Sequence, residues 1–176
     1  EPYRRQRQMC IRDSYNIKRV KVVDAGNSAG RIIFIDNQNY NNGIQLNQIN
    51  GPESDLPVTF IFSALKPVVL TGTITGNVRM FFAGDFQFGM GTETVAYNGL
   101  TMFMSNGDMK ICSSIWSYKN NPGGGFLSSD KDITIVESAS FQGQIQCRGN
   151  FKTSGLIQFN DSVLKAPGFT VPKGMK

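Results

Sequence analysis

The sequence predicts an all-β domain built from short stacked strands, and three observations lead to this prediction. A turn-and-strand pattern, first seen as Gly84-Asp85-Phe86-Gln87-Phe88, recurs from residues 107, 131 and 149, at intervals of 23, 24 and 18 residues. The composition includes 13 Phe and 19 Gly with abundant Asn, Thr and Ser, which is typical of β structure. No stretch shows the apolar spacing of three and four residues that marks an amphipathic helix.

The recurring unit is a turn with Asp or Asn, usually after Gly, followed by alternating apolar and polar residues, the pattern of a half-buried strand. A unit of this size cannot bury its own apolar face and needs neighbours. The sequence therefore predicts a β-solenoid-like stack. The interval of 18 residues, a multiple of six, suits a triangular coil with three short faces. A β-sandwich or meander with turns at similar spacing is the alternative.

The first residues are set apart from the rest of the chain. Residues 4–14, Arg-Arg-Gln-Arg-Gln-Met-Cys-Ile-Arg-Asp-Ser, resemble the translation of a transposase-type sequencing adapter that recurs in proteins predicted from shotgun assemblies. A basic, Gln-rich run joined abruptly to a strand-like segment agrees with a foreign origin. Residues 1–14 are therefore left out of the fold prediction, and we expect the native protein to continue upstream of residue 15. A basic arm for nucleic acid is the competing interpretation.

The net charge changes once this segment is set aside. The whole chain has 18 Lys and Arg against 13 Asp and Glu, a formal charge of +5. Residues 1–14 hold four of the Arg and two of the acids, which leaves 14 basic and 11 acidic residues, a charge of +3. So small an excess does not predict nucleic-acid binding. After residue 15 no apolar run is long enough to cross a bilayer as a helix.

Residues 15–70 predict a set of antiparallel strands that precedes the repeats. Apolar alternation marks each strand, and segments rich in Gly, Asn and Pro separate them. The dipeptide Asn42-Gly43 favours a hairpin turn. We expect residues 71–166 to form the repeat-containing region and residues 167–176 a C-terminal tail. The expected strands before the repeats cover residues 15–23, 31–35, 44–49, 58–62 and 68–74.

The last two repeat units predict which side chains form the core. They superpose with an offset of 18 residues, which places Ile133 over Phe151 and Phe141 over Phe159. Alternation within each unit then divides inward from outward positions. The side chains expected to point inward are Ile133, Ile135, Phe141, Ile145, Cys147, Phe151, Ile157 and Phe159.

Residues 119–125, Lys-Asn-Asn-Pro-Gly-Gly-Gly, predict the clearest loop of the chain. The aromatic residues Trp116 and Tyr118 beside it, together with Tyr97, are candidates for a surface that binds a partner or a sugar. The glycines lack the following Lys-Ser/Thr pair and the helix of a phosphate-binding loop. The loop therefore predicts a surface feature and no nucleotide site.

Four residues occupy equivalent positions at the start of the repeats: Asp85, Asp108, Asp132 and Asn150. Asp and Asn side chains bond to backbone groups in turns, so we predict that these residues form a row of turn caps. The alternative is catalytic, because β-solenoids also carry polysaccharide lyases and hydrolases that work with acids arranged on one face.

Few other residues suggest chemistry. The chain has no histidine, the commonest general base and zinc ligand. Beyond residue 14 it holds two cysteines, Cys112 and Cys147, which we expect as free thiols, with a disulfide as the alternative. We therefore predict no catalytic set, no cofactor and no metal site, and a protein that is not an enzyme.

Four segments of the chain resemble the β-solenoid region of PilX-like pilus-assembly and related bacterial envelope proteins. The last of them is similar to that family's x-F-x-G-x-I-x-x-x-G-x coil, with Phe141, Gly143, Ile145 and Gly149 at the fixed positions. The likeness covers roughly half of the chain. The segments are Thr71-Gly72-Thr73-Ile74-Thr75-Gly76-Asn77-Val78, Phe82-Ala83-Gly84-Asp85-Phe86, Met104-Ser105-Asn106-Gly107-Asp108-Met109 and residues 133–151.

This resemblance implies a structural or adhesive role at the bacterial cell surface or outside the cell. The implied partners are pilus or envelope proteins, or surface glycans, and the family supplies no catalytic residues. The alternative is a phage tail-spike or carbohydrate-active β-helix that binds or cleaves polysaccharide.

Overall fold

The computed structural model is all-β, which confirms the predicted class, with 54% of the residues in strands and 3% in helix. Its strands form three sheets, and one 3-10 helix, η1 (Asp161–Lys165), follows the last strand. The residues that the structure describes are 19–20, 23–35, 37, 44–89, 96–97, 99–115, 124–137 and 139–165.

The three sheets contain seven, four and seven strands. The first sheet holds β1 (Arg19–Val20), β4 (Ile44–Leu46), β7 (Val68–Leu70), β10 (Phe86–Phe88), β13 (Met109–Ile111), β15 (Ile133–Ile135) and β17 (Phe151–Thr153). The second holds β2 (Val23–Asp24), β5 (Ile49–Asn50), β8 (Ile74–Thr75) and β11 (Ala96–Tyr97). The third holds β3 (Ile32–Ile35), β6 (Val58–Phe62), β9 (Val78–Phe82), β12 (Leu100–Ser105), β14 (Gly124–Ser129), β16 (Ser140–Cys147) and β18 (Leu156–Phe159).

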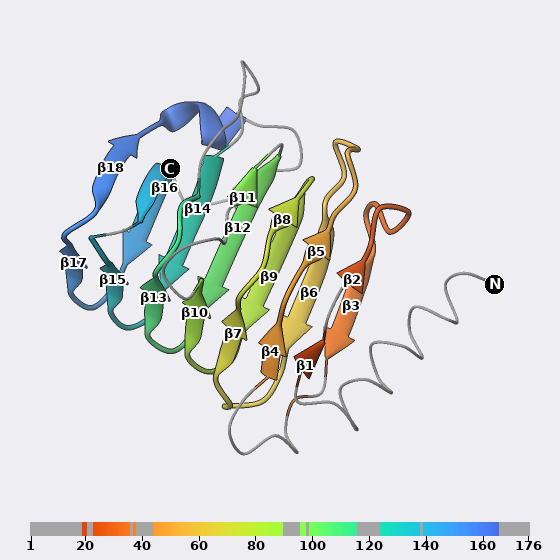
Figure 1. Cartoon of the computed structure of the whole chain (residues 1–176), viewed down its shortest axis with the longest axis horizontal. Helices are drawn as coiled ribbons and strands as arrows, with labels where there is room; N and C mark the ends of the chain where they lie inside the picture. The colour runs from red at the N-terminus through yellow and green to blue at the C-terminus, as the bar shows by residue number, and fades with distance from the viewer. Residues whose placement is uncertain are drawn as a thin grey trace.

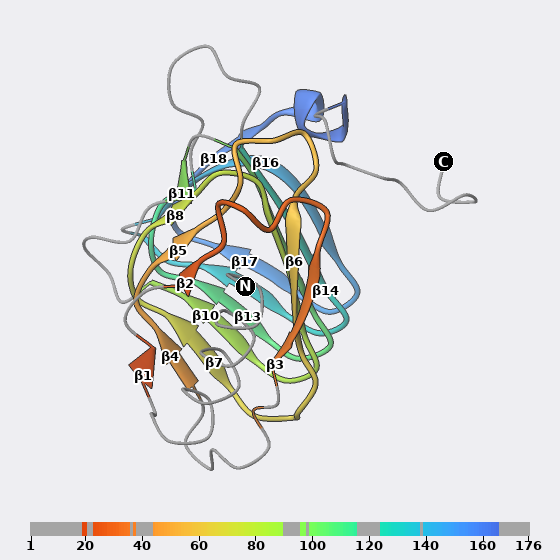
Figure 2. The same ribbon diagram turned by 90° about the vertical axis from the view of Figure 1, so that its right-hand side faces the viewer.

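Consecutive strands belong to different sheets, and each strand pairs with the strand of the same sheet in the next circuit (Figures 1 and 2). Every strand pair in the described residues is parallel. One circuit of the chain therefore adds one strand to each sheet it visits. The arrangement is compatible with a β-helix-like fold.

This pairing corrects the prediction for residues 15–70. The strands before residue 71 are parallel, as in the pairs β1–β4 and β3–β6, and not antiparallel. The antiparallel sandwich considered as an alternative does not form either. The dipeptide Asn42-Gly43, predicted to favour a hairpin turn, lies outside the described residues, and the described strands on either side of it, β3 and β4, lie in different sheets. Strands from both sides of residue 70, such as β4, β7 and β10, pair within one sheet.

Parallel pairing in register lines up identical positions of successive circuits. One such row runs across β6, β9, β12, β14 and β16, with each residue paired to its neighbour on the next strand: Phe60, Met80, Phe103, Leu127 and Ile145. The first four are buried and belong to one continuous core. Each circuit thus covers the apolar face of the one before it, which removes that surface from water.

Aromatic rings fill the middle of this core. The rings of Phe62 and Phe82 stack with centroids 5.2 Å apart, and those of Phe82 and Phe86 with centroids 3.9 Å apart. Phe103 packs tilted against Phe86 at 4.7 Å and against Phe88 at 5.3 Å. Such contacts add to the apolar area that the rings bury.

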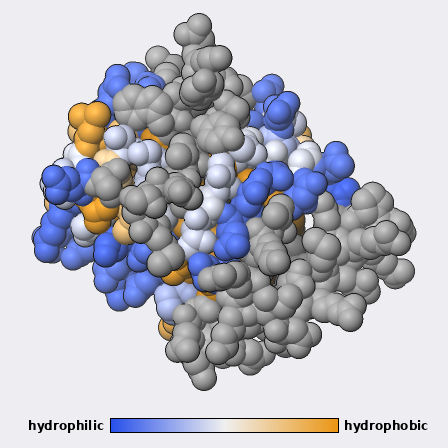
Figure 3. Space-filling model, viewed as in Figure 1, coloured by the Kyte–Doolittle hydropathy of each residue, from blue (hydrophilic) through white to orange (hydrophobic). Residues whose placement is uncertain are grey.

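The core prediction is right inside the stack and wrong at its end. Ile133, Ile135 and Phe141 are fully buried, whereas Ile145, Cys147 and Ile157 are partly buried and pack against the core. Phe151 and Phe159 are 40% and 65% exposed. They stand in register with Ile133 and Gly143, but they belong to the last described circuit, and within the described ranges no further strand covers them. Figure 3 shows apolar surface among hydrophilic surface at this end of the stack.

Two glycines of the predicted 119–125 loop belong to a strand instead. Gly124 and Gly125 begin β14, and Gly125 lies beside Gly143 of β16. A Cβ on Gly143 would collide with the carbonyl oxygen of Gly125, and the backbone at Gly143 has a φ of 146°. These glycines therefore serve close approach of two strands, and the rest of the predicted loop lies outside the described residues.

Candidate functional site

The four predicted capping residues lie in a row at one corner of the stack, where the chain passes from the third sheet to the first. Oδ1 of Asp85 accepts a hydrogen bond from the backbone N–H of Asp108 at 2.8 Å. Oδ1 of Asp108 accepts one from the N–H of Asp132 at 3.2 Å, and Oδ1 of Asp132 accepts one from the N–H of Asn150 at 2.8 Å. We call these four residues the carboxylate ladder.

The carboxylate ladder connects circuits that are 18 to 24 residues apart in sequence. Each carboxylate satisfies a backbone donor of the next circuit just before that circuit's strand begins. A hydrogen bond to an ionised acceptor is stronger than one between neutral groups. The ladder therefore uses one oxygen of each of its three aspartates to hold the corner together.

The glycine before the capping residue gives the carboxylate room. A Cβ on Gly107 would collide with Oδ1 of Asp85 and would come within 2.7 Å of its backbone nitrogen. Lys131 occupies the equivalent position in the next circuit, and the hydrogen bond there is the longest of the three, 3.2 Å against 2.8 Å. The corner that has a side chain at residue 131 in place of glycine therefore has the longer hydrogen bond between circuits.

A second row at the same corner was missed by the sequence analysis. Oγ of Ser105 donates a hydrogen bond to the carbonyl of Gly84 at 2.7 Å and accepts one from the N–H of Gly107 at 3.0 Å. Both partners are backbone groups of adjacent circuits. The hydroxyl of Ser105 therefore joins two neighbouring circuits at the same corner as the carboxylate of Asp85.

The same bridge recurs in the next circuit, and a cysteine takes its place in the circuit after that. Oγ of Ser129 donates to the carbonyl of Gly107 at 2.7 Å and accepts from the N–H of Lys131 at 2.9 Å. Sγ of Cys147 takes the third position, 3.0 Å from the carbonyl oxygen of Lys131. The signal in the sequence is a Ser or Cys three residues before Asp108, Asp132 and Asn150, whereas Phe82 stands at that distance before Asp85.

Asn77 makes a comparable bridge at another corner, between β8 and β9. Its Nδ2 donates to the carbonyl of Ser54 at 2.7 Å, and its Oδ1 accepts from the N–H of Leu100 at 2.7 Å. One amide therefore joins three successive circuits. Asn suits this position because it carries a donor and an acceptor on one side chain.

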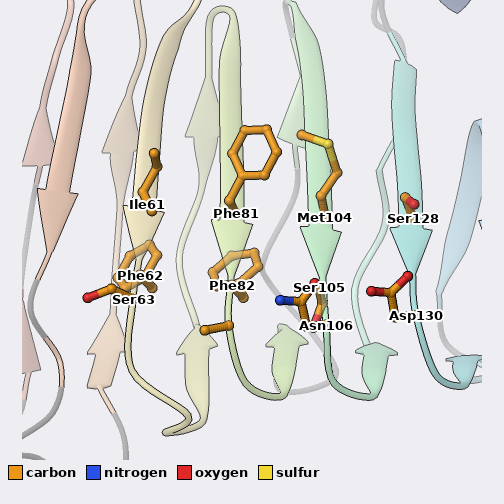
Figure 4. A pocket seen from close by; sticks show the side chains of 11 residues that line it. Ile61, Phe62, Ser63, Phe81, Phe82, Met104, Ser105, Asn106, Ser128 and Asp130 are labelled. Carbon is orange, nitrogen blue, oxygen red and sulfur yellow. The ribbon is translucent and has the colours of Figure 1, made fainter. Parts of the chain in front are cut away.

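The outward face of the third sheet carries a shallow groove of about 330 Å³ (Figure 4). Its floor is a row of side chains in register on four neighbouring strands: Ile61, Phe81, Met104 and Ser128. These residues alternate with the buried ones, so they point away from the core. Phe81 is 39% exposed, although an apolar ring is costly to leave in water.

A second row of side chains borders the groove where these strands end. Ser63, Asn106 and Asp130 are exposed, and Ala83 lies between the first two. Figure 4 shows this row beside the apolar one, with Asn106 and Asp130 on neighbouring circuits. Oδ1 of Asp130 lies 3.5 Å from Nε of Arg148 in an exposed ion pair. One row is therefore apolar except for Ser128, and the other carries hydrogen-bonding groups except at Ala83.

The predicted aromatic surface is not located by the structure. Trp116 and Tyr118 lie outside the described residues. Tyr97 belongs to β11, but its side chain is likewise outside what the structure describes. The exposed aromatic residue that the structure does place in a groove is Phe81.

The two cysteines of the described residues, Cys112 and Cys147, are not joined in a disulfide. Burial raises the pKa of the Cys112 thiol, and the positive charge of Lys110 opposes that shift. Within the described ranges no group of three or more Cys, Asp or Glu side chains could hold a metal ion.

Comparison of the chain with protein-family models, curated proteins and solved structures finds no match. In the part of the chain that the structure describes, no helix is long and apolar enough to cross a membrane.

Proposed function

We propose that this chain is a β-solenoid module with a structural or adhesive role in a bacterial cell-envelope or pilus-associated protein. The observation that carries the proposal is the carboxylate ladder. Asp85, Asp108 and Asp132 each bind a backbone N–H of the next circuit. Their arrangement serves the stacking of circuits, which is what a scaffold needs.

The stack of parallel strands supports the solenoid assignment. Each strand pairs only with the strands of the circuits before and after it. In repeat architectures of this kind, stability comes from the interfaces between neighbouring units, and the product is a long, rigid surface. A rigid surface with repeated positions suits attachment to a partner at or beyond the cell surface.

The PilX-like resemblance supports the envelope setting. Two of its segments, 82–86 and 104–109, contain the ladder positions Asp85 and Asp108. The fixed positions of its final coil include Phe141 and Gly143, which the structure uses for core packing and close strand approach. The residues that carry the resemblance therefore cap corners or pack in the core of this chain, which agrees with a non-catalytic role.

A phage tail-spike or carbohydrate-active enzyme is the second candidate, and the outward groove favours it. Glycoside hydrolysis uses two carboxyl groups that flank the bond to be cleaved. The groove is lined by one carboxylate, Asp130, which is paired with Arg148. The groove is thus better suited to binding than to cleavage.

The test screens residues 15–176 for turnover of a polysaccharide panel, with Asn variants of Asp85, Asp108 and Asp132. We expect no cleavage by any of the proteins. Hydrolysis or lyase activity that one Asn variant loses while it keeps its melting temperature would overturn the structural role, because an amide cannot exchange the required proton. The reading frame upstream of residue 15 tests the setting: a prepilin-like leader with an apolar helix supports the pilus, and neighbouring phage tail genes support the tail-spike.

A further inference from the structure

The groove on the third sheet carries one side chain of each of its two rows on every circuit. Ile61, Phe81 and Met104 place one apolar side chain on each of three successive strands, in register. Two residues further along the same strands stand the residues of the second row, of which Ser63 and Asn106 are polar and exposed. Ser128 interrupts the apolar row and Ala83 the polar row, so a ligand that fits must present one mainly apolar side and one mainly hydrogen-bonding side.

The repeat distance narrows the class of ligand. Neighbouring strands lie about 4.7–4.9 Å apart, so the groove repeats at that distance. Side chains on one face of an extended peptide recur only every ~6.6–6.8 Å, twice the rise of one residue. The side chains of an extended peptide that crosses these strands would therefore lose their alignment with the groove residues within a few circuits. A sugar ring in a linear glycan advances its chain by about one strand spacing.

The chemistry of a pyranose ring matches both sides of the groove. One face of the ring carries C–H groups, which pack on an aromatic face because that face is electron-rich. Its edge carries hydroxyl groups, which can donate to the carboxylate of Asp130 and bond to the amide of Asn106 in both directions. Apolar walls with a few convergent polar groups are the usual make-up of a ligand site.

We infer that this groove binds a neutral linear glycan that runs across β6, β9, β12 and β14, with a sugar ring on Phe81 and hydroxyl groups toward Asn106 and Asp130. The inference rests on the proposed adhesive function and names its ligand class. It assigns binding to the outward groove and not to the aromatic residues Trp116, Tyr118 and Tyr97.

Isothermal titration of residues 15–176 with cellohexaose and with chitohexaose tests the inference, with an alginate hexamer as the acidic comparison. We expect one of the neutral hexamers to bind more tightly than the acidic one. The Phe81→Ala variant should lose about tenfold or more in affinity, and Asn106→Ala should lose affinity several-fold. Phe81→Trp should keep or improve binding, because the larger ring offers the same stacking face.

Two matched variants locate the site. Phe159→Ala removes the same side chain from an exposed position on β18, outside the groove, and should leave affinity unchanged. Trp116→Ala tests the competing aromatic surface. The inference is overturned if neither neutral hexamer binds, if Phe81→Ala binds as wild type does, or if Trp116→Ala and not Phe81→Ala abolishes binding.

The melting temperature of every variant separates this inference from the scaffold proposal. Phe81 points outward, so Phe81→Ala should fold and melt close to wild type. Loss of glycan binding in a protein that melts normally concerns the groove alone. Binding by an apolar peptide, sensitive to Phe81→Ala and unmatched by either neutral hexamer, would assign the groove to a protein partner and overturn the glycan inference.

Discussion

Oδ1 of Asp85 accepts a hydrogen bond from the backbone N–H of Asp108, 2.8 Å away and 23 residues later in the chain. The same relationship joins Asp108 to Asp132 and Asp132 to Asn150. Because each bond joins two circuits, the ladder opposes separation of the stack at one corner. If the aspartates are caps, their substitution changes the stability of the protein. If one of them is an acid catalyst, its substitution by Asn abolishes activity and leaves stability unchanged.

Asp108→Asn should have a mild effect on stability, because an amide oxygen can also accept the N–H of Asp132. Asp108→Ala should lower the free energy of unfolding by about 1 kcal/mol, the usual net value of one hydrogen bond. Urea denaturation of both variants measures the difference. Equal stability of the Ala and Asn variants would contradict the capping role.

Gly107→Ala should destabilise the protein by about 1–3 kcal/mol, the usual cost of forcing an extra carbon into a packed site. The new Cβ would press on Asp85, both its carboxylate and its backbone nitrogen. Gly26→Ala is the control, because a Cβ there meets its nearest atom at 3.5 Å, an ordinary contact. Chemical denaturation measures the stability of both variants. A Gly107→Ala protein no less stable than the control would contradict the prediction, because it would show that the corner accommodates the extra carbon without cost.

Phe141→Ala should cost about 3–5 kcal/mol of unfolding free energy, because it empties a large aromatic site inside a packed core. Phe141 has no exposed surface and lies between neighbouring circuits. Phe159→Ala is the matched comparison and should cost much less, since Phe159 is 65% exposed. Denaturation midpoints that rank the two variants in the opposite order would contradict this assignment of the core.

The repeat spacing was readable from the sequence because each corner is marked by Asp or Asn. The intervals of 23, 24 and 18 residues each correspond to one circuit, and Ile133 pairs with Phe151 as the offset of 18 predicts. Phe141, however, pairs with Ile157 and not with Phe159. The connection after Ile135 has two more residues than the one after Thr153, and an offset taken over a whole unit cannot show such a local difference.

Strand direction could not be read from the sequence before residue 71. Alternation shows that a segment such as Val58–Phe62 has a buried face, but it does not show which strand lies beside it. The partner is set by the connection, and here the chain leaves each sheet before it returns. An Asn-Gly dipeptide such as residues 42–43 carries no information on this point, because it favours a tight turn but does not show which strands pair.

The candidate groove left a signal that the sequence analysis did not use. In β9 the buried positions are Val78, Met80 and Phe82, so Phe81 falls in the phase that should be polar. Met104 of β12 is also apolar in the outward phase, where it packs against the buried cluster of Leu100, Met102 and Val163. An apolar residue in the outward phase of two neighbouring strands points to a surface with a task. The polar residues of the groove could be identified only from the strand register, because Asn106 and Asp130 lie on different circuits from Phe81.

The thiol of Cys112 should make stability fall as pH rises. Burial raises its pKa in the folded protein, so the unfolded chain releases this proton first. Stability from this group is therefore complete below the ordinary pKa of a cysteine, about 8.5, and is lost as pH rises above it. Urea denaturation at pH 7 and pH 9.5 should show a smaller decrease for Cys112→Ala than for wild type. In the native protein Cys112, 6% exposed, should also alkylate more slowly than the partly exposed Cys147, and equal rates for the two thiols would contradict the burial on which the pKa shift depends.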